Sequence, residues 1–295
     1  MKRKILDGAF LDRLDAAALC LKSAMTGFFG GSRKARSYGN TVEFADFREY
    51  FPGDDIRRID WNVYARFEKY FIKLFTDERQ MHNQILVDCS ASMACGKPEK
   101  AAQALRIAAA FGYLSVASMD RVSFKMMEGN KSRDLGFTIT NKDSFYRAAQ
   151  AMENTDFEGE VDLEKAIVNL EAPGYDDGLT IIISDFLTES DWKKAIDFLM
   201  YKRREILMIQ ILSPDELYPD LDGRIDMLDS ENDANNMRVI MTRKMVEAYQ
   251  KALDEYEKEI IDFCASRGVT FFTVCSDDPI EKVIFGKGYE TEVIR

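Results

Sequence analysis

The feature that most constrains this fold is an alternation of short apolar runs with helix-patterned segments, which continues from about residue 84 to residue 274. The runs that we expect to form strands are residues 84–88, 121–127, 179–184, 206–212 and 269–274. The helical patterns between and around them are residues 97–117, 142–152, 162–170, 190–204 and 243–266. Strands that alternate with helices form parallel sheets covered on both faces. The order therefore predicts an α/β fold with a doubly wound, mostly parallel sheet.

The pattern also predicts finer details of this part of the chain. The stretch 243–266 has apolar residues at steps of three and four, which is typical of a helix that covers a sheet, and Gly268 is expected to end it. Residues 134–139 are expected to form a short edge strand. Residues 224–228 and 238–241 are expected to pair as a hairpin around a polar stretch.

The first 80 residues have a different character. Residues 5–24 are expected to form an amphipathic helix, and residues 41–83 are dense in aromatic and charged side chains. Within them, residues 71–75 have the pattern of a strand. We therefore expect two parts: an N-terminal lobe of residues 1–80, packed on an α/β domain of residues 81–295.

The distribution of charge excludes some classes of protein. The net charge is −11; residues 1–80 hold 15 Lys and Arg against 12 Asp and Glu, which leaves 25 against 39 for residues 81–295. An acidic body argues against a nucleic-acid partner, because phosphates require a basic face. The apolar runs are also far shorter than the roughly 18 residues that a membrane span needs, so no membrane span is expected.

The cysteines and the single histidine point to a cytoplasmic protein without histidine-based catalysis. The five cysteines form no C-x-x-C pair, and the N-terminus does not have the pattern of a secretion signal, so we expect reduced thiols and a cytoplasmic location. The only histidine, His82, is expected in a surface turn. There is no Walker motif, so the chain itself is not expected to hydrolyse a nucleotide.

The residues most suited to chemistry follow the first core strand. Asp88, Ser90 and Ser92 form a D-x-S-x-S pattern at its end, and Asp185 follows the strand 179–184. Ligands of parallel α/β sheets bind beyond the carboxyl ends of the strands. Carboxylate and hydroxyl oxygens are ligands that Mg²⁺ prefers. We expect these four side chains to face one crevice, with Cys89 turned into the core.

This arrangement resembles the von Willebrand factor A-like fold and its metal-ion-dependent adhesion site. The resemblance implies that Asp88, Ser90, Ser92 and Asp185 bind a divalent ion together with a threonine from another loop. Here that loop is Gly159-Glu160-Val161-Asp162-Leu163, and Val161 has no side-chain oxygen. Weak Mg²⁺ binding is therefore expected, with Glu160 or Asp162 in compensation. Alternatively, the two serines cap a helix and Asp88 bonds backbone amides.

A longer pattern lies between residues 43 and 79. It includes Glu43-Phe44-x-x-Phe47-Arg48-Glu49-Tyr50-x-Pro52-Gly53-Asp54-Asp55-Ile56-Arg57-x-Ile59-Asp60-Trp61, followed by Ala65-Arg66 and Glu78-Arg79. This pattern resembles the signature of the domain of unknown function 58 family, whose bacterial and archaeal members contain a von Willebrand factor A-like domain. Their genes commonly lie beside those of MoxR-type AAA+ ATPases. The resemblance thus implies both a fold and a class of protein partner.

The charges of this signature have two interpretations. Asp54, Asp55 and Asp60 alternate with Arg57, Arg58 and Arg66. Equal numbers of both signs favour salt bridges that lock the N-terminal lobe onto the sheet. The alternative is an acidic cluster for metal binding or catalysis.

Three hypotheses of function follow. The first is a non-catalytic interaction module, an adaptor or cofactor of a MoxR-type AAA+ ATPase, that uses a degenerate metal-ion-dependent adhesion site. The second is a magnesium-dependent, phosphatase-like hydrolase with Asp88 as nucleophile, although no second acid follows in the loop through Cys95. The third is a structural scaffold without metal.

Overall fold

The computed structural model describes residues 5–16, 18, 42–77, 81–135, 138–170, 178–219, 223–227 and 237–287. The chain divides into two units. Residues 1–24 and 81–295 form the first, here called the α/β unit, and residues 25–80 form the second, here called the signature unit. In the ranges that are described, no helix is both long and apolar enough to cross a membrane.

The α/β unit is built on a six-stranded sheet with the strand order β10-β7-β6-β3-β4-β5. Its strands are β3 (His82–Asp88), β4 (Arg121–Glu128), β5 (Lys131–Asp134), β6 (Leu179–Ser184), β7 (Glu205–Leu212) and β10 (Thr270–Cys275). Neighbouring strands run parallel, except that β5 is antiparallel to β4 at the edge. The predicted α/β class with a doubly wound, mostly parallel sheet is therefore confirmed.

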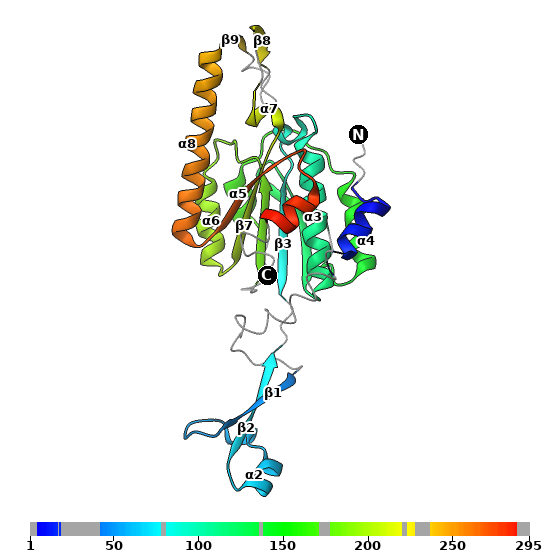
Figure 1. Cartoon of the computed structure of the whole chain (residues 1–295), viewed down its shortest axis with the longest axis vertical. Coiled ribbons are helices and arrows are strands. Elements are labelled where there is room, and N and C mark those ends of the chain that lie inside the picture. Colours follow the sequence, from blue (N-terminus) through cyan, green and yellow to red (C-terminus); the bar gives the residue numbers. More distant parts are fainter. Residues whose placement is uncertain are drawn as a thin grey trace. The chain divides into compact units, whose positions relative to one another are not determined.

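Helices cover both faces of this sheet. The helices are α3 (Lys100–Ala117), α4 (Lys142–Met152), α5 (Leu163–Val168), α6 (Trp192–Tyr201), α7 (Pro214–Leu217) and α8 (Arg243–Arg267). Figure 1 shows α5, α6 and α8 on one side of the sheet and α3, α4 and the blue N-terminal helix on the other. Two short turns, η2 (Ala91–Ala94) and η4 (Lys282–Lys287), and a hairpin of β8 (Gly223–Met227) and β9 (Met237–Met241) complete the unit. The predicted hairpin and the long helix ending at Gly268 are confirmed.

Alternation along the central strands gives the sheet two apolar layers. Ile85 and Val87 of β3 are buried with α3 and α4, whereas Leu86 between them is buried with α5, α6 and α8. Successive strand residues point to opposite faces. A strand buried on both faces therefore appears in the sequence as a continuous apolar run. Cys89 lies in the first layer with an exposure of 1%, as expected from its position between Asp88 and Ser90.

The N-terminal helix, residues 8–16, belongs to the α/β unit. Ile5, Phe10 and Leu14 are buried in the layer of α3 and α4, and the Ile5 amide donates to Glu153 at 2.9 Å. The sequence predicts a lobe of residues 1–80, whereas the division of the chain places residues 1–24 in the α/β unit, where Ile5, Phe10 and Leu14 are buried. Apart from Ala18, the remainder of the helix expected to residue 24 lies outside the described residues.

Three details differ from the sequence-based expectations. The edge strand spans Lys131–Asp134 rather than 134–139, and Ile139 forms only an isolated bridge to Val122. Helix α3 begins at Lys100 instead of residue 97. The expected surface turn at His82 is wrong, because β3 begins there between two neighbouring strands. The His82 ring is buried and its Nε2 lies 3.1 Å from Ser123 Oγ.

The signature unit is a small two-stranded structure. Strand β1 (Val42–Glu49) pairs antiparallel with β2 (Phe71–Asp77), and the connection contains η1 (Ile56–Arg58) and helix α2 (Trp61–Phe67). The strand expected at residues 71–75 is therefore present and two residues longer. A two-stranded sheet buries little apolar surface, which leaves several large apolar side chains of this unit exposed, as described below.

The close approach of α3 to β4 gives a first testable prediction. A Cβ atom on Gly112 would lie 2.3 Å from Cζ of Phe124, so the helix packs against the ring without space for a methyl group. Gly112→Ala should cost about 1–3 kcal/mol of the free energy of unfolding through overpacking, despite a helix propensity about 1 kcal/mol better. Phe124→Leu in the same chain should recover part of the loss. Denaturant unfolding measures both, and a Gly112→Ala protein more stable than wild type would contradict the packing.

Candidate functional site

The candidate site lies where the chain changes direction across the sheet. From β3 the chain moves to β4 on one side, then returns to β6 on the other side of β3. The carboxyl ends of β3 and β6 therefore lie side by side. Asp88 is at the end of β3, and Ser184 and Asp185 are at the end of β6. Open α/β sheets bind ligands at such switch points. The name crevice is used below for the buried side chains at this one, Asp88, Ser184 and Asp185, and the residues that contact them.

Asp88 is held by two hydrogen bonds at the end of β3. The residue is 3% exposed; Oδ1 accepts from the Ser90 amide at 2.9 Å, and Oδ2 accepts from Ser184 Oγ at 2.5 Å. Ser184 was missed by the sequence analysis, although its position directly before Asp185 at a strand end was a usable signal. Both carboxylate oxygens are thus engaged in fixing the loop. This is the backbone-bonding role that the non-functional alternative assigned to Asp88.

Burial and charge shift the acidity of this group. Burial, and then the nearby charge of Asp185, raise the pKa of Asp88 to about 6, while the bonds from Ser184 and Ser90 oppose the shift. The hydrogen bond from Ser184, the residue before Asp185, places the two aspartates at adjacent strand ends, as the sequence predicted.

Ser90, Ser92 and the loop of residues 159–163, here called the third loop, lie beside Asp88. Ser90 Oγ is 3.0 Å from Ser92 Oγ, and neither η2 nor α3 receives a side-chain cap at its start. The serines therefore do not have the capping role of the alternative interpretation. The loop that resembles the threonine-bearing loop is adjacent, because the Ala91 amide donates to the Gly159 carbonyl at 2.9 Å.

The side chains of that third loop have other structural roles. Val161 is 6% exposed and lies in the apolar layer with α5 and α6. Asp162 caps α5 by accepting from the Lys165 amide at 3.0 Å, and it pairs with Lys165 Nζ at 2.7 Å. Glu160 is exposed. The loop thus reaches the crevice, but its carboxylate at Asp162 is already used by the helix.

A lysine that the sequence analysis did not consider is at the centre of the arrangement. Lys100, the first residue of α3, has a side chain 1% exposed; its Nζ lies 2.8 Å from Asp185 Oδ2 and 2.6 Å from Glu216 Oε1. Burial works against the charged form, but the two carboxylates outweigh it and raise the pKa of Lys100. In the sequence Lys100 lies eight residues after Ser92, at the start of an alanine-rich helix, where it looks like an ordinary first-turn residue.

These residues fit a divalent metal ion poorly. Asp185 already binds a buried ammonium group, Asp88 accepts two hydrogen bonds, and the position of the expected threonine is filled by Val161. Among the described residues no group of three or more His, Cys, Asp or Glu side chains has the arrangement of a metal site. Binding of Mg²⁺ by Asp88, Ser90, Ser92 and Asp185 remains a prediction that a titration must test.

The signature residues are used mainly inside their own unit. Arg48 pairs with Asp54 at 2.7 Å, Asp55 accepts from the Arg57 amide, and Asp60 caps α2 and pairs with Lys73 at 3.0 Å. Local caps and ion pairs therefore account for all three aspartates, and the ion pairs go to Arg48 and Lys73 of the same unit, not to the expected Arg57 or Arg66.

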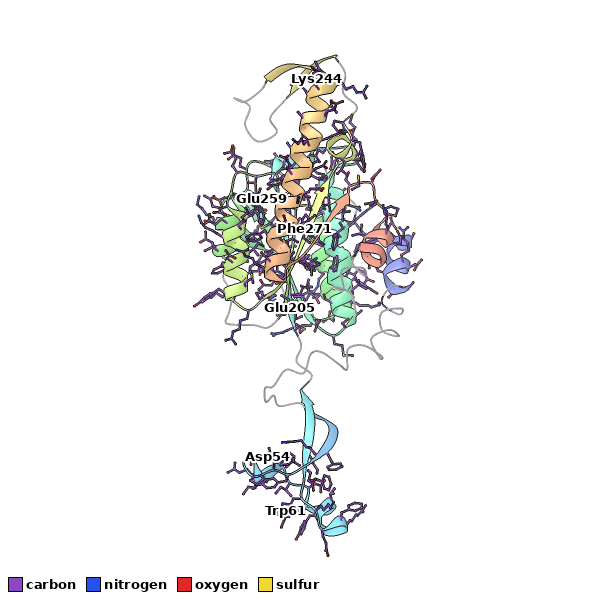
Figure 2. The ribbon with its side chains drawn as sticks, turned by 60° about the vertical axis from the view of Figure 1, so that its left-hand side comes forward. Asp54, Trp61, Glu205, Lys244, Glu259 and Phe271 are labelled. Carbon is purple, nitrogen blue, oxygen red and sulfur yellow. The ribbon has the colours of Figure 1, made fainter. Side chains whose placement is uncertain are left out.

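The remaining signature side chains are aromatic or more exposed. Tyr50 packs edge-on against Tyr70, and Glu49 lies at the end of β1. Arg57 and Arg66 are exposed and pair with no carboxylate in the part of the chain that the structure describes. Figure 2 shows Trp61 and Asp54 in this unit, and Trp61 is 61% exposed.

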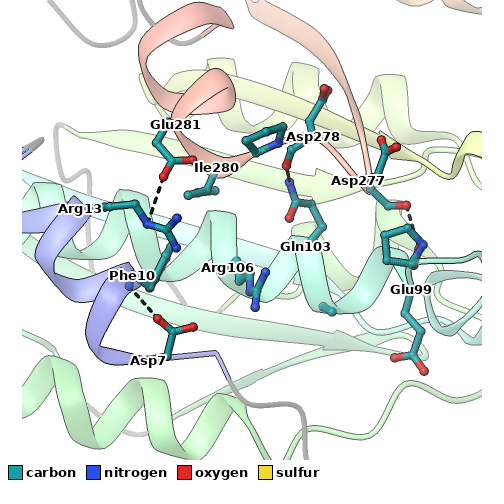
Figure 3. Close-up of a pocket in the computed structure, with 14 residues that line it drawn as sticks. Asp7, Phe10, Arg13, Glu99, Gln103, Arg106, Asp277, Asp278, Ile280 and Glu281 are labelled. Carbon is teal, nitrogen blue, oxygen red and sulfur yellow. Dashed lines mark hydrogen bonds and ion pairs between the residues drawn. The ribbon is translucent and has the colours of Figure 1, made fainter.

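A separate pocket of about 320 Å³ lies between the N-terminal helix, α3 and the segment after β10 (Figure 3). Its walls are fastened by the ion pair of Arg13 with Glu281 at 3.0 Å and by the bond from Gln103 Nε2 to the Asp278 carbonyl at 2.8 Å. These contacts tie the N-terminal helix and α3 to the segment that follows β10. We therefore interpret the pocket as a packing junction between these elements and not as a ligand site.

The fold and crevice define a doubly wound α/β protein with a charged site at the switch point between β3 and β6. Residues 46–259 match the family described as "Protein of unknown function DUF58", and the chain belongs to this family. The sequence-based resemblance to the domain of unknown function 58 is thus confirmed.

The relatives and solved structures that are similar to this chain add no activity. The chain is 28% identical over 219 residues to the uncharacterized proteins Mb1516 of Mycobacterium bovis and Rv1480 of Mycobacterium tuberculosis, covering 72% of this chain and 68% of each relative. Similar solved structures include an aerotolerance-related membrane protein from Bacteroides fragilis (15% identity, TM-score 0.41, 72% and 99% of the two chains) and the SpRpn10 VWA domain (9%, 0.38, 70% and 94%). Both TM-scores are low, so the fold assignment rests on the sheet topology.

Proposed function

We propose that this chain is a non-catalytic protein-interaction module that binds a MoxR-type AAA+ ATPase. The observation that carries the proposal is the set of large apolar side chains exposed on the small signature unit. Phe51, Ile56, Trp61 and Phe67 are 58%, 64%, 61% and 67% exposed. All four lie within residues 51–67 of the signature unit. Large exposed apolar surface marks sites of protein interaction, and tryptophan is enriched among the residues that dominate binding energy.

The choice of an ATPase as partner rests on the family resemblance. Members of this family are commonly encoded beside MoxR-type ATPases, and this chain contains no Walker motif of its own. In this proposal the ATPase supplies the work and the present chain supplies docking. A cytoplasmic location is part of the proposal, and the four described cysteines, which are all free thiols, support it.

The internal pairing of the crevice supports a binding role over a hydrolytic one. A nucleophilic Asp88 would need an accessible carboxylate and a second acid as proton donor. Asp88 is instead buried, with both oxygens hydrogen-bonded, and the neighbouring Asp185 is paired with Lys100.

Binding of the purified ATPase from the same organism tests the proposal and locates the surface. Trp61→Ala should weaken binding at least 30-fold if Trp61 is a binding hot spot worth about 2 kcal/mol or more. Tyr201→Ala, which removes a similarly exposed aromatic side chain on α6, should change it little. The sequence analysis placed the contact at the crevice, so Asp88→Ala is the second arm.

The outcomes separate the two surfaces. Loss of binding confined to Trp61→Ala, with the fold intact by circular dichroism, locates the contact on the signature unit. Loss confined to Asp88→Ala locates it at the crevice. An Arg57→Glu variant checks whether charge contributes on the signature unit. If the wild-type chain does not bind the ATPase in calorimetry at micromolar concentrations, the proposed partner is wrong.

A further inference from the structure

The Lys100 ammonium is placed in the crevice by three separate segments. Lys100 stands at the first turn of α3, Asp185 follows β6, and Glu216 lies on α7 after β7. The Nζ atom contacts both carboxylates within 2.8 Å. A buried ammonium with two close carboxylates is stable only where the surrounding structure is organised to hold it.

Backbone hydrogen bonds also hold the two carboxylates that contact the ammonium. The second oxygen of Asp185 accepts from the Leu187 amide at 3.1 Å, and the second oxygen of Glu216 accepts from the Ser213 amide at 2.7 Å. Each carboxylate therefore has one oxygen fixed by the backbone and one directed at Lys100. The arrangement is a preformed cation site whose cation is a side chain of the same protein.

A divalent ion would have to compete with this side chain. Asp185 is the carboxylate that adjoins Asp88, and it is the one whose charge the ammonium balances. A second cation beside the ammonium would be repelled strongly in a buried region. The threonine oxygen that could offset this repulsion is missing, because Val161 stands at that position and packs into the apolar layer.

We propose that the Lys100 ammonium is the permanent cation of this crevice and takes the place of a divalent metal ion. This inference goes beyond the proposed function and does not depend on which surface binds the partner, because it is tested on the isolated protein. Failure of the ATPase to bind and failure of the metal prediction are therefore distinguishable results.

The test compares four proteins in a titration with MgCl₂ and MnCl₂ at constant ionic strength, with thermal unfolding as the readout. Wild type and Val161→Thr should shift their melting temperatures by less than about 1 °C, because Lys100 still occupies Asp185. Lys100→Met and the double variant Lys100→Met/Val161→Thr should gain about 2–5 °C, the shift expected at roughly ten times the dissociation constant. The double variant should respond at lower metal concentration.

A matched control removes a different lysine. Lys125 of β4 has a side chain 9% exposed and pairs with Asp134 at 3.2 Å, away from the crevice residues named above. Lys125→Met should stay as insensitive to metal as wild type. If Lys100→Met does not fold, Lys100→Met/Glu216→Gln replaces it, since this variant removes one of the carboxylates left unpaired.

Three results would overturn the inference. A saturable shift in wild type that Asp88→Ala abolishes would show that metal binds despite Lys100. A shift in Val161→Thr alone would show that the missing oxygen, and not the ammonium, excludes the ion. A folded Lys100→Met/Val161→Thr protein that gains no response would show that the ammonium does not stand in the metal's place.

Discussion

Replacing Lys100 by methionine is expected to lower the free energy of unfolding by about 3–5 kcal/mol, the usual cost of removing one partner of a buried ion pair. The methionine retains most of the volume but leaves Asp185 and Glu216 without their shared cation. Asp185 is 2% exposed, so water cannot restore the lost interaction fully. Urea unfolding in EDTA measures the loss.

Comparing the loss of stability in three variants identifies the cause of the Lys100→Met effect. Lys125→Met should cost about 1 kcal/mol or less, because its partner Asp134 has a side chain 45% exposed to water. Glu216→Gln added to Lys100→Met should recover part of the loss by removing one unpaired charge. If Lys100→Met and Lys125→Met unfold at the same urea concentration, Lys100 does not have the central role described here.

The stability of wild type relative to Asp88→Asn is expected to fall by about 3 kcal/mol as the pH rises from 4 to above 7. The pKa of Asp88 in the folded protein is about 6, above the unfolded value of about 3.9. A raised pKa gives stability that is fully present below the unfolded value and is lost as the pH rises through the folded value. At about 1.4 kcal/mol for each pH unit, the difference between the two pKa values corresponds to about 3 kcal/mol.

Comparison with Asp88→Asn isolates this group, because the other titrating residues are common to both proteins. The charged groups near Asp88 are Asp185, and through it Lys100 and Glu216. Ser184→Ala removes a hydrogen bond that lowers the pKa of Asp88, so it should move the midpoint of the pH effect upward. The measurement is denaturant unfolding in EDTA at several pH values. A difference between wild type and Asp88→Asn that does not change with pH would contradict the expected pH dependence.

The main architecture could be predicted because the central strands are buried on both faces. Continuous apolar runs such as 179–184, separated by helical patterns, indicate a parallel sheet, and that sheet brings Asp88 and Asp185 to one edge. The same logic placed Cys89 in the core. His82 was misplaced because a polar residue at the start of a buried strand has the pattern of a turn until its partner, Ser123, is known.

Lys100 and Glu216 could not be found in the same way. They are 116 positions apart, and their contact depends on where α7 turns after β7. In the sequence Glu216 belongs to a run of acidic residues that suggests a solvated loop, and Lys100 looks like an ordinary first-turn residue. The assignment of residues 1–24 to the α/β unit could not be predicted for a related reason. The pattern of an amphipathic helix does not indicate which surface the helix covers.

A crystal structure of the wild-type protein soaked in MnCl₂, with anomalous data collected for manganese, tests most directly whether the Lys100 side chain occupies the cation position of this crevice. We expect no manganese peak at Asp88, Ser90 and Ser92, with Lys100 Nζ within hydrogen-bond distance of Asp185 and Glu216. A manganese ion bound to Asp88 and the two serines, with the Lys100 side chain displaced from Asp185, would contradict it.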